Sequence, residues 1–252
     1  MTREEAARRA LPLVDLTSLN DDDTPDRIAA LCEQAVTPAG HVAAVCVYAP
    51  FVRQCVYALR GTGVKIATVA NFPQGALDVA AVRAEVEREV ADGAHEVDVV
   101  LPYTAYAAGD RDGPLEVVRA AREAAASVTL KVILETGRLD SAELIRAAAS
   151  DALAAGADFV KTSTGKLTPG ATLEAARPML ETIRASGHGG FKAAGGVRTA
   201  EEAGRYLALA DEVLGEEWAT PDTFRFGASS LLADLVAALG VAEPAPPPSA
   251  GY

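Results

Sequence analysis

Cysteine and histidine are both scarce in this chain of 252 residues, with three of each. Three cysteines are too few for a disulfide framework, and the spacing of Cys32, Cys46 and Cys55 relative to the histidines matches no zinc-binding pattern. We therefore expect reduced thiols and no structural metal.

Long hydrophobic runs and an excess of positive charge are also missing. No apolar run reaches the roughly 18 residues that a membrane helix needs, and the charged start, MTREEAARRA, contains no apolar signal region. We expect a cytoplasmic protein without a membrane partner. The 35 acidic and 23 basic residues give a formal net charge of -12. This charge would repel a polyphosphate backbone, so nucleic acid is not an expected partner.

The rest of the composition is typical of a folded protein. Half of the residues are hydrophobic and 23% are charged, which is enough apolar material for a sizeable core. Because no internal boundary is visible, we expect residues 1–241 to form a single domain. Residues 242–252, AEPAPPPSAGY, are rich in proline and poor in large apolar groups, and they predict a flexible tail.

Lysine is sparse, because 18 of the 23 basic residues are arginine. The arginines lie mostly in helix-like stretches, where either cation serves as a solvated surface charge. Lys131, Lys161 and Lys192 instead lie in or beside short apolar runs, and Lys166 lies in a Ser/Thr/Gly loop. A desolvated amine can lose its proton near neutral pH, whereas a guanidinium cannot. The alternative is a composition bias that removed surface lysine and left these by chance.

Short apolar, β-branched runs alternate with helix-like stretches along the chain. Eight such runs occupy residues 13–17, 43–48, 65–72, 96–103, 129–136, 158–164, 190–196 and 225–230. They repeat about every 30 residues, the length of one βα unit, and their lack of polar alternation indicates strands covered on both faces. Eight units without a G-x-G-x-x-G motif predict an α/β fold, a closed (β/α)8 TIM barrel, rather than an open doubly wound sheet. Residues 1–10 predict a short extra N-terminal helix.

Five polar side chains interrupt the predicted strands: Asp15, Asp98, Lys131, Lys161 and Lys192. Catalytic groups of such barrels collect at the C-terminal ends of the strands, so these side chains are expected to converge on the axis. Lys161 and Lys192 are 31 residues apart, which is one βα step, and this predicts neighbouring strands at similar height. Two adjacent ammonium groups disfavour double protonation, so one amine can become a Schiff-base nucleophile. The alternative is a buried ion network without chemistry.

Three of the predicted loops at that end favour an anion. They are TSTGK (162–166), AAGGVRT (193–199) and GASS (227–230), the last at the start of a helix. Together they offer glycine amides, hydroxyl groups and two cations, Lys166 and Arg198, and barrels often bind phosphate in loops of this kind. We expect a phosphorylated small-molecule substrate. The alternative is ordinary glycine turns and serine helix caps.

The motifs of the chain, taken in order, resemble one enzyme family. LVDLTSLNDDD, AAVCVYAPF, KIATVANFPQGA, EVDVVLPY, LKVILETG, ADFVKTSTGK, GFKAAGGVRTAEEA and RFGASSLL are similar to the motifs of deoxyribose-phosphate aldolases, the class I aldolases of deoxynucleoside catabolism. The resemblance covers roughly residues 10 to 240, and the lysine motifs are highly specific to that family.

The resemblance implies an enzyme that reversibly cleaves 2-deoxy-D-ribose 5-phosphate to D-glyceraldehyde 3-phosphate and acetaldehyde, without a metal or an organic cofactor. Lys161, in ADFVKTSTGK, matches the Schiff-base lysine of the family, and Lys192, in GFKAAGG, matches its second lysine. Asp98, in EVDVV, matches the proton shuttle. Relatives are commonly monomers or homodimers, so a homodimer is a possible assembly.

The resemblance also implies supporting and phosphate-binding residues. Asp15 and Lys131 match residues that orient other groups and water, and Tyr252 matches a C-terminal tyrosine that visits the site and assists proton transfer. The matched phosphate-binding residues are Gly165, Lys166, Gly195, Gly196, Arg198, Gly227, Ser229 and Ser230.

Two other functions remain open at this point. A phosphosugar isomerase or epimerase on the same barrel would need acid and base groups but no covalent lysine. A phosphosugar-binding protein that regulates a partner would bind without turnover, and the retained pair of Lys161 and Lys192 argues against it.

Overall fold

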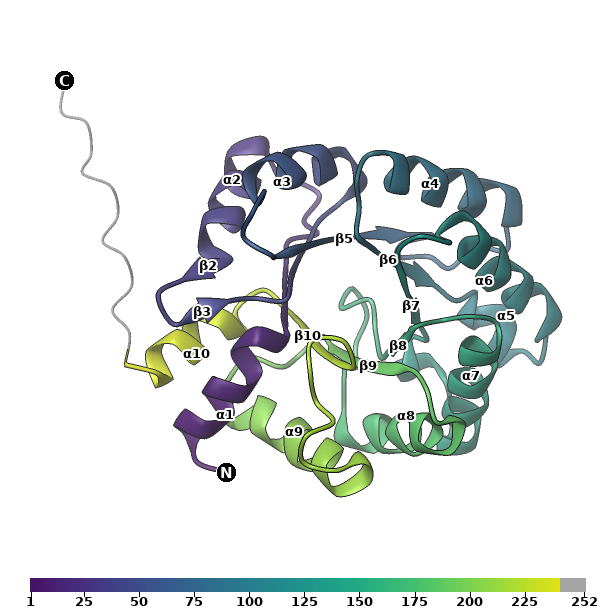
Figure 1. The fold of residues 1–252 in the computed structure, drawn as a ribbon. Coiled ribbons are helices and arrows are strands. Elements are labelled where there is room, and N and C mark those ends of the chain that lie inside the picture. Colours follow the sequence, from purple (N-terminus) through teal and green to yellow (C-terminus); the bar gives the residue numbers. More distant parts are fainter. Residues whose placement is uncertain (241–252) are drawn as a thin grey trace.

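The computed structural model describes residues 1–240, which form a closed barrel of parallel strands with helices around it (Figure 1). The strands, in the order in which they pair around the barrel, are β1 (Val14–Thr17), β10 (Phe224–Ala228), β9 (Gly190–Ala194), β8 (Phe159–Lys161), β7 (Thr129–Ile133), β6 (Glu96–Val100), β5 (Lys65–Ala70) and β4 (Ala44–Cys46). The predicted (β/α)8 TIM barrel is confirmed. Tyr252 and the rest of the predicted tail, 242–252, lie outside the described residues.

The outer layer consists of the helices that follow the barrel strands along the chain. They are α2 (Pro25–Gln34), α3 (Val52–Ala58), α4 (Val79–Ala91), α5 (Tyr103–Ala107), α6 (Asp112–Ala124), α7 (Ala142–Ala154), α8 (Leu173–Ser186), α9 (Ala200–Leu214) and α10 (Leu231–Ala238). Short 3-10 helices occupy Leu11–Leu13, Ala49–Phe51 and Thr136–Arg138. The predicted extra helix is α1 (Arg3–Ala10), which packs against α9 and α10 (Figure 1).

The helix α7 illustrates how the sequence sets these elements. Ser141 caps its N-terminus by accepting a hydrogen bond from the Leu144 amide at 3.1 Å. Ile145, Ala148 and Ala152 follow at spacings of three and four and are buried against the barrel. The helix therefore begins at a polar cap and presents one apolar stripe to the strands.

A small ladder was not predicted from the sequence. Residues Val36–Thr37 (β2) and Gly40–His41 (β3) pair in antiparallel fashion between α2 and β4. The Thr37 hydroxyl donates to the Gly40 carbonyl at 2.7 Å and closes this turn. Two-residue strands carry no periodicity, so the sequence pattern cannot indicate them.

All barrel strands except β1 end earlier than the apolar runs that predict them. The run 158–164 contains β8, which ends at Lys161, and Thr162 and Thr164 have left the ladder. The Thr162 hydroxyl bonds the Ala194 carbonyl at 3.2 Å, and Thr164 bonds a buried glutamate. The residues beyond the strand ends thus remain buried in loops at the C-terminal end of the barrel, which is where the candidate site lies.

The inside of the barrel is divided between an apolar half and a charged half. Alternation in β1 places Val14 and Leu16 in the outer core between strands and helices, and it turns Asp15 inward. Small apolar side chains from β4 and β5, including Ala44 and Ala67, form a separate inner cluster. The strands β6 to β10 and β1 fill the rest with charged side chains, so the polar residues predicted to converge on the axis do so.

Glu89, in α4, is a buried carboxyl group outside this charged half. Its side chain is 1% exposed, and within residues 1–240 neither of its oxygens has a hydrogen-bond partner. Burial, with the negative charge of Glu85 nearby, raises the pKa of Glu89 to about 9. The folded protein therefore holds this side chain in its protonated form at neutral pH.

Glu89 makes stability depend on pH in a direction that can be measured. Because the unfolded chain ionises at the ordinary pKa and the folded chain only near pH 9, the free energy of unfolding should fall as the pH rises between these values. The variant Glu89→Gln should remove this slope, which by linkage is about 1.4 kcal/mol per pH unit, and should raise the free energy of unfolding at pH 8 relative to the wild type. Urea denaturation from pH 5 to pH 9 tests this, with the exposed Glu87→Gln as control. An unchanged slope in Glu89→Gln would contradict a protonated Glu89.

Among residues 1–240, no helix combines the length and the apolar character that crossing a bilayer requires.

Candidate active site

The two lysines predicted to be neighbours lie side by side on β8 and β9. Lys161 and Lys192 are directly paired in the register of these strands. Both amines donate to the same carboxylate oxygen, Oδ2 of Asp98, at 2.8 Å each. The two nitrogens are therefore no farther apart than the sum of these distances, and no layer of hydrocarbon separates them. The three residues that the resemblance identifies as catalytic meet at one atom.

Asp15 and Lys131 form ion pairs with this group of side chains. The Lys131 amine donates to Oδ1 of Asp98 at 2.9 Å, and the Lys192 amine donates to Oδ2 of Asp15. All four side chains have no solvent exposure, and Lys161 is 3% exposed. The structure thus brings together all five polar residues that were predicted from the strands.

The charges of Asp98 and Lys192 stabilise one another. Burial alone would raise the pKa of Asp98, but the ammonium groups of Lys131, Lys161 and Lys192 outweigh burial and hold the pKa well below its usual range. Burial likewise works against the charge of Lys192, but Asp15 and Asp98 raise the pKa of this amine above its ordinary value. Asp98 is therefore a carboxylate and Lys192 an ammonium group at neutral pH.

Lys161 differs from its neighbours in the direction of its shift. Burial lowers the pKa of Lys161 and the positive charge of Lys192 lowers it further, while Asp98 opposes both. The sequence predicted the direction and the participation of Lys192, but it assigned the main effect to charge repulsion. In the structure burial is the larger cause, because Lys161 is enclosed even though it lines the pocket above it.

A pocket of about 280 Å³ opens above Lys161 at the C-terminal end of the barrel. Lys161 forms part of its wall, together with Thr17 at the end of β1 and Leu19 and Asn20 in the segment that follows. All of the residues predicted to bind phosphate also line it: Gly165, Lys166, Gly195, Gly196, Arg198, Gly227, Ser229 and Ser230. The amine and the predicted anion-binding groups therefore face one shared space.

Glycine is required at two places around this pocket. Gly195 and Gly196 have φ values of 83° and 101°, in the left-handed region that other residues rarely adopt. A Cβ on Gly227 would lie 3.0 Å from Cε of Lys192, so a larger residue there would displace the lysine stem. These glycines shape the loop and leave room for the buried amine.

The loop that carries Lys166 has a support that the sequence reasoning missed. Glu135, two residues after the end of β7, is fully buried, and its Oε2 accepts from the Thr164 amide at 3.1 Å and the Thr164 hydroxyl at 2.6 Å. The same hydroxyl accepts from the Lys166 amide at 3.1 Å. Glu135 has a φ of 53°, a costly conformation for a residue with a side chain. The sequence does contain one indication of this role, because Glu135 is an acidic residue near the end of the apolar run 129–136.

Two buried charged residues below the lysines were also missed. Glu96 and Arg225 are each 3% exposed and bond to one another inside the barrel. The sequence reasoning treated arginine as a surface charge and took no account of Glu96, although its spacing of two from Asp98 places both side chains on the same face of β6.

This arrangement supports a specific type of chemistry. An enclosed amine with a lowered pKa opens onto a pocket, and a carboxylate and a second ammonium group lie within hydrogen-bond reach of it. Such an amine can add to a carbonyl carbon, and the neighbouring groups can move protons. Within the part of the chain that the structure covers, no cluster of three or more His, Cys, Asp and Glu side chains is arranged to hold a metal ion.

Comparison with known proteins finds aldolases among the similar chains. A family model described as DeoC/LacD family aldolase matches residues 9–237. The structure of a "putative deoxyribose-phosphate aldolase" from Coccidioides immitis is similar to the chain, with 32% identity over 90% of this chain and 85% of that one and a TM-score of 0.80.

Two further structures are similar over nearly the whole length. One, a "putative deoxyribose-phosphate aldolase" from Toxoplasma gondii ME49, has 26% identity, covers 94% of this chain and 97% of that chain, and has a TM-score of 0.86. The other, a tetrameric deoxyribose phosphate aldolase from Aeropyrum pernix, shares the fold at 24% identity, with 95% and 92% coverage and a TM-score of 0.74.

Proposed function

The chain belongs to the DeoC/LacD family of aldolases, and from this premise we propose that it cleaves 2-deoxy-D-ribose 5-phosphate to D-glyceraldehyde 3-phosphate and acetaldehyde through a Schiff base on Lys161. The observation that carries the proposal is the enclosed Lys161 amine, which shares one oxygen of Asp98 with Lys192 and faces a pocket lined by cations and glycine amides. The chemistry needs no metal or organic cofactor.

The first half of the reaction forms the covalent intermediate. The uncharged amine of Lys161 adds to C1 of the open-chain sugar, and loss of water from the carbinolamine gives an iminium ion. The positive nitrogen then serves as the electron sink. The charge of Lys192 favours the neutral amine at the start, because a second ammonium group beside it is costly.

The second half breaks and reforms bonds around this ion. A base removes the proton of the C3 hydroxyl, the C2–C3 bond breaks, and its electron pair moves toward the iminium nitrogen to form an enamine. Glyceraldehyde 3-phosphate leaves, an acid protonates C2, and water releases acetaldehyde and the free amine. Asp98 and Lys192, acting through water, are the proposed proton carriers, with Asp15 and Lys131 orienting them.

The loops around the pocket are the proposed phosphate site. Lys166 and Arg198 supply positive charge, and the amides and hydroxyls of the GASS segment (227–230) supply hydrogen-bond donors at the start of α10. Holding the far end of the sugar orients C1 toward Lys161, so binding energy at the phosphate aids the reaction at the other end.

The phosphate site gives a prediction that compares two substrates. The variant Lys166→Met should raise KM for 2-deoxyribose 5-phosphate about 10-fold or more, because a charge-assisted contact is lost. It should change the slower cleavage of unphosphorylated 2-deoxyribose little, since that substrate makes no such contact. Steady-state kinetics with both sugars measures the difference. Equal losses on both would show that Lys166 acts on the fold or the lysines rather than on phosphate.

An activity assay tests the proposed reaction against the other functions. Incubation with 2-deoxyribose 5-phosphate, coupled to detection of glyceraldehyde 3-phosphate, should show turnover that depends on Lys161. An isomerase or epimerase would convert a phosphosugar without releasing acetaldehyde, and a regulatory binding protein would show binding without turnover. Either result would refute the proposal.

The family resemblance also supports a setting for this activity. We expect a role in deoxyribose phosphate catabolism in the cytoplasm, with the chain as a monomer or a homodimer. Light scattering coupled to gel filtration measures the assembly directly.

A further inference from the structure

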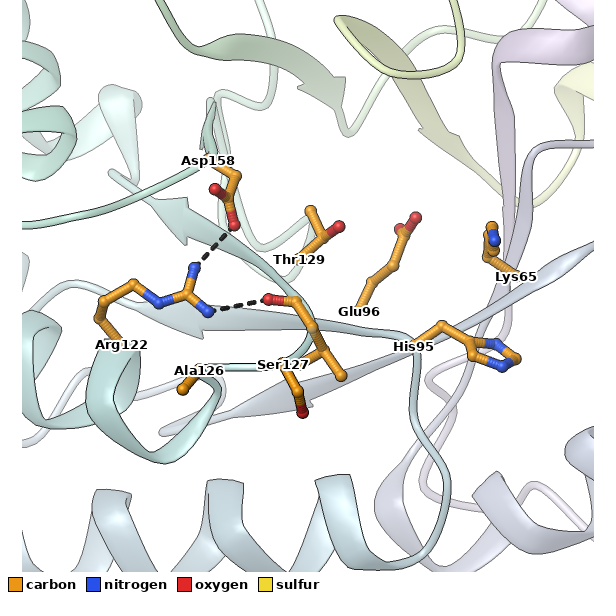
Figure 2. A pocket seen from close by; sticks show the side chains of 9 residues that line it. Lys65, His95, Glu96, Arg122, Ala126, Ser127, Thr129 and Asp158 are labelled. Atoms are coloured by element: carbon orange, nitrogen blue, oxygen red, sulfur yellow. Dashed lines mark hydrogen bonds and ion pairs between the residues drawn. The ribbon is translucent and has the colours of Figure 1, made fainter.

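A bidentate ion pair lies at the opposite end of the barrel from the pocket above Lys161. Nη2 of Arg225 donates to Oε1 of Glu96 at 2.7 Å, and Nη1 donates to Oε2 at 3.0 Å. Both residues line a hollow at the starts of the strands that also includes Lys65 and Thr129. Figure 2 shows Glu96 beside Thr129 at this end, with Lys65 and His95 to one side. The pair is thus placed away from any substrate bound at Lys161.

Two chains of ion pairs connect this pair to Asp98. Nη1 of Arg225 donates to Oδ1 of Asp15 at 2.6 Å, and Asp15 accepts from Lys192, which donates to Asp98. On the other side, Lys131 donates to Oε2 of Glu96 at 2.5 Å and to Asp98 at 2.9 Å. Both chains end at the carboxylate that accepts from Lys161.

The cluster has one cation more than it has carboxylates. Its carboxylates are Asp15, Glu96 and Asp98, and its cations are Lys131, Lys161, Lys192 and Arg225. An unpaired charge raises the free energy of the folded protein where water is excluded. With an uncharged Lys161, three carboxylates face three cations and the buried charges balance.

Only Lys161 is suited to give up its charge. A guanidinium such as Arg225 keeps its proton in proteins. The carboxylates around Lys131 and Lys192 overcome burial and raise the pKa of both amines, whereas the pKa of Lys161 is lowered. The cluster therefore reaches balance by deprotonating the amine that faces the pocket.

The titratable groups that face Lys161 come from three strands. They are Asp98 on β6, Lys192 on β9 and the thiol of Cys46 on β4. Burial raises the pKa of Cys46 to about 11, so this thiol is neutral at physiological pH. Lys161 is therefore governed by Asp98 and Lys192, and both are tied to the distant pair.

We propose that Arg225 and Glu96 are positioning residues with opposing effects on the charge of Lys161: Arg225 favours the uncharged amine, Glu96 opposes it, and together they leave the buried charges balanced when Lys161 is neutral and Asp98 is ionised. This inference rests on the proposed function, because it takes Lys161 as the nucleophile. The pair touches no reacting atom, and it acts through Asp15, Lys131 and Lys192.

Opposite charge changes should move the pH profile in opposite directions. With Lys161 uncharged, Arg225→Gln leaves three carboxylates facing two cations, and this excess favours a protonated Lys161. The rising limb of the pH profile of kcat/KM should therefore move to higher pH. Glu96→Gln leaves the cations in excess and should move it to lower pH. Each shift should be on the order of one pH unit, the effect of one charge roughly 12 Å away at an effective dielectric constant of about 20. At pH 7 this corresponds to about a 10-fold loss for Arg225→Gln.

The double variant separates charge balance from structural damage. Glu96→Gln combined with Arg225→Gln removes one charge of each sign, so its rising limb should return toward that of the wild type. Arg225→Lys keeps the positive charge, so the rising limb of its pH profile should stay at the wild-type pH. Lys65→Gln removes an exposed cation that lines the same hollow but lies outside the cluster, and it should leave the profile unchanged.

The measurements are kcat/KM for cleavage between pH 5 and pH 10 and the rate of borohydride trapping with acetaldehyde over the same range. If Arg225→Gln alone does not fold, the double variant can be compared with Glu96→Gln, because these two differ only by the charge of Arg225. The rising limb of the double variant must then lie at higher pH than that of Glu96→Gln. Single variants that shift in the same direction, or not at all, would overturn the inference. Failure of the wild type to form a trapped adduct would instead refute the proposed function.

Discussion

Replacement of Lys161 by leucine is expected to lower kcat/KM for cleavage of 2-deoxyribose 5-phosphate by about 10⁴-fold or more. Without the amine no iminium ion forms, and no other group can take up the electrons of the C2–C3 bond. Steady-state kinetics over a range of substrate concentrations measures this loss. Asp98 keeps the ion pairs with Lys131 and Lys192 in this variant, so the protein should still fold.

The control for this result is a lysine in the same pocket. Lys166 also lines the pocket, but it is assigned to phosphate, and Lys166→Met should keep measurable cleavage at high substrate concentration. Thermal unfolding of both variants shows whether either is damaged as a whole. If Lys161→Leu retained near-normal cleavage while folded, the covalent mechanism would be wrong.

The second large effect is expected at Lys192. The variant Lys192→Leu should lower kcat/KM by about 10² to 10⁴-fold, the contribution typical of a positioned proton carrier. It should also move the rising limb of the pH profile upward. The charge of Lys192 lowers the pKa of Lys161, so its removal raises that pKa, and a higher pH is then needed to free the amine.

A second substitution at the same position separates these two roles. Lys192→Arg keeps the positive charge, so the limb should stay near its wild-type position, but a guanidinium does not release a proton and the rate should remain low. The pH dependence of kcat/KM for both variants gives the comparison. A limb that stays in place in Lys192→Leu would exclude the charge of Lys192 as a cause of the lowered pKa.

Much of the site was predictable because strand alternation and the βα repeat are local patterns. The 31-residue spacing placed Lys161 and Lys192 on neighbouring strands, and the register of β8 and β9 pairs them directly. The loops with Gly165, Gly195 and Ser229 followed from their order after successive strands, and the pocket includes all three. These predictions required only that the strands close into a barrel in the order of the sequence.

The parts that were missed depend on contacts between distant segments. Arg225 and Glu96 are 129 residues apart, and nothing in either local run shows that the other will neutralise it. Glu135, which has a left-handed backbone conformation, bonds Thr164, and Thr164 lies 29 residues farther along the chain. The relative weight of burial and charge at Lys161 likewise follows from how completely the surrounding strands exclude water. Tyr252 lies outside the described residues, and its role stays a prediction.

The central claim is that Lys161 is an amine able to form an imine near neutral pH. The most direct test is to incubate the wild-type protein with acetaldehyde at pH 7, reduce it with sodium borohydride, and identify the modified peptide by mass spectrometry. The account predicts one stable N-ethyl group, on Lys161, and none on Lys131, Lys166 or Lys192. An unmodified Lys161, or modification of Lys192 in its place, would contradict it.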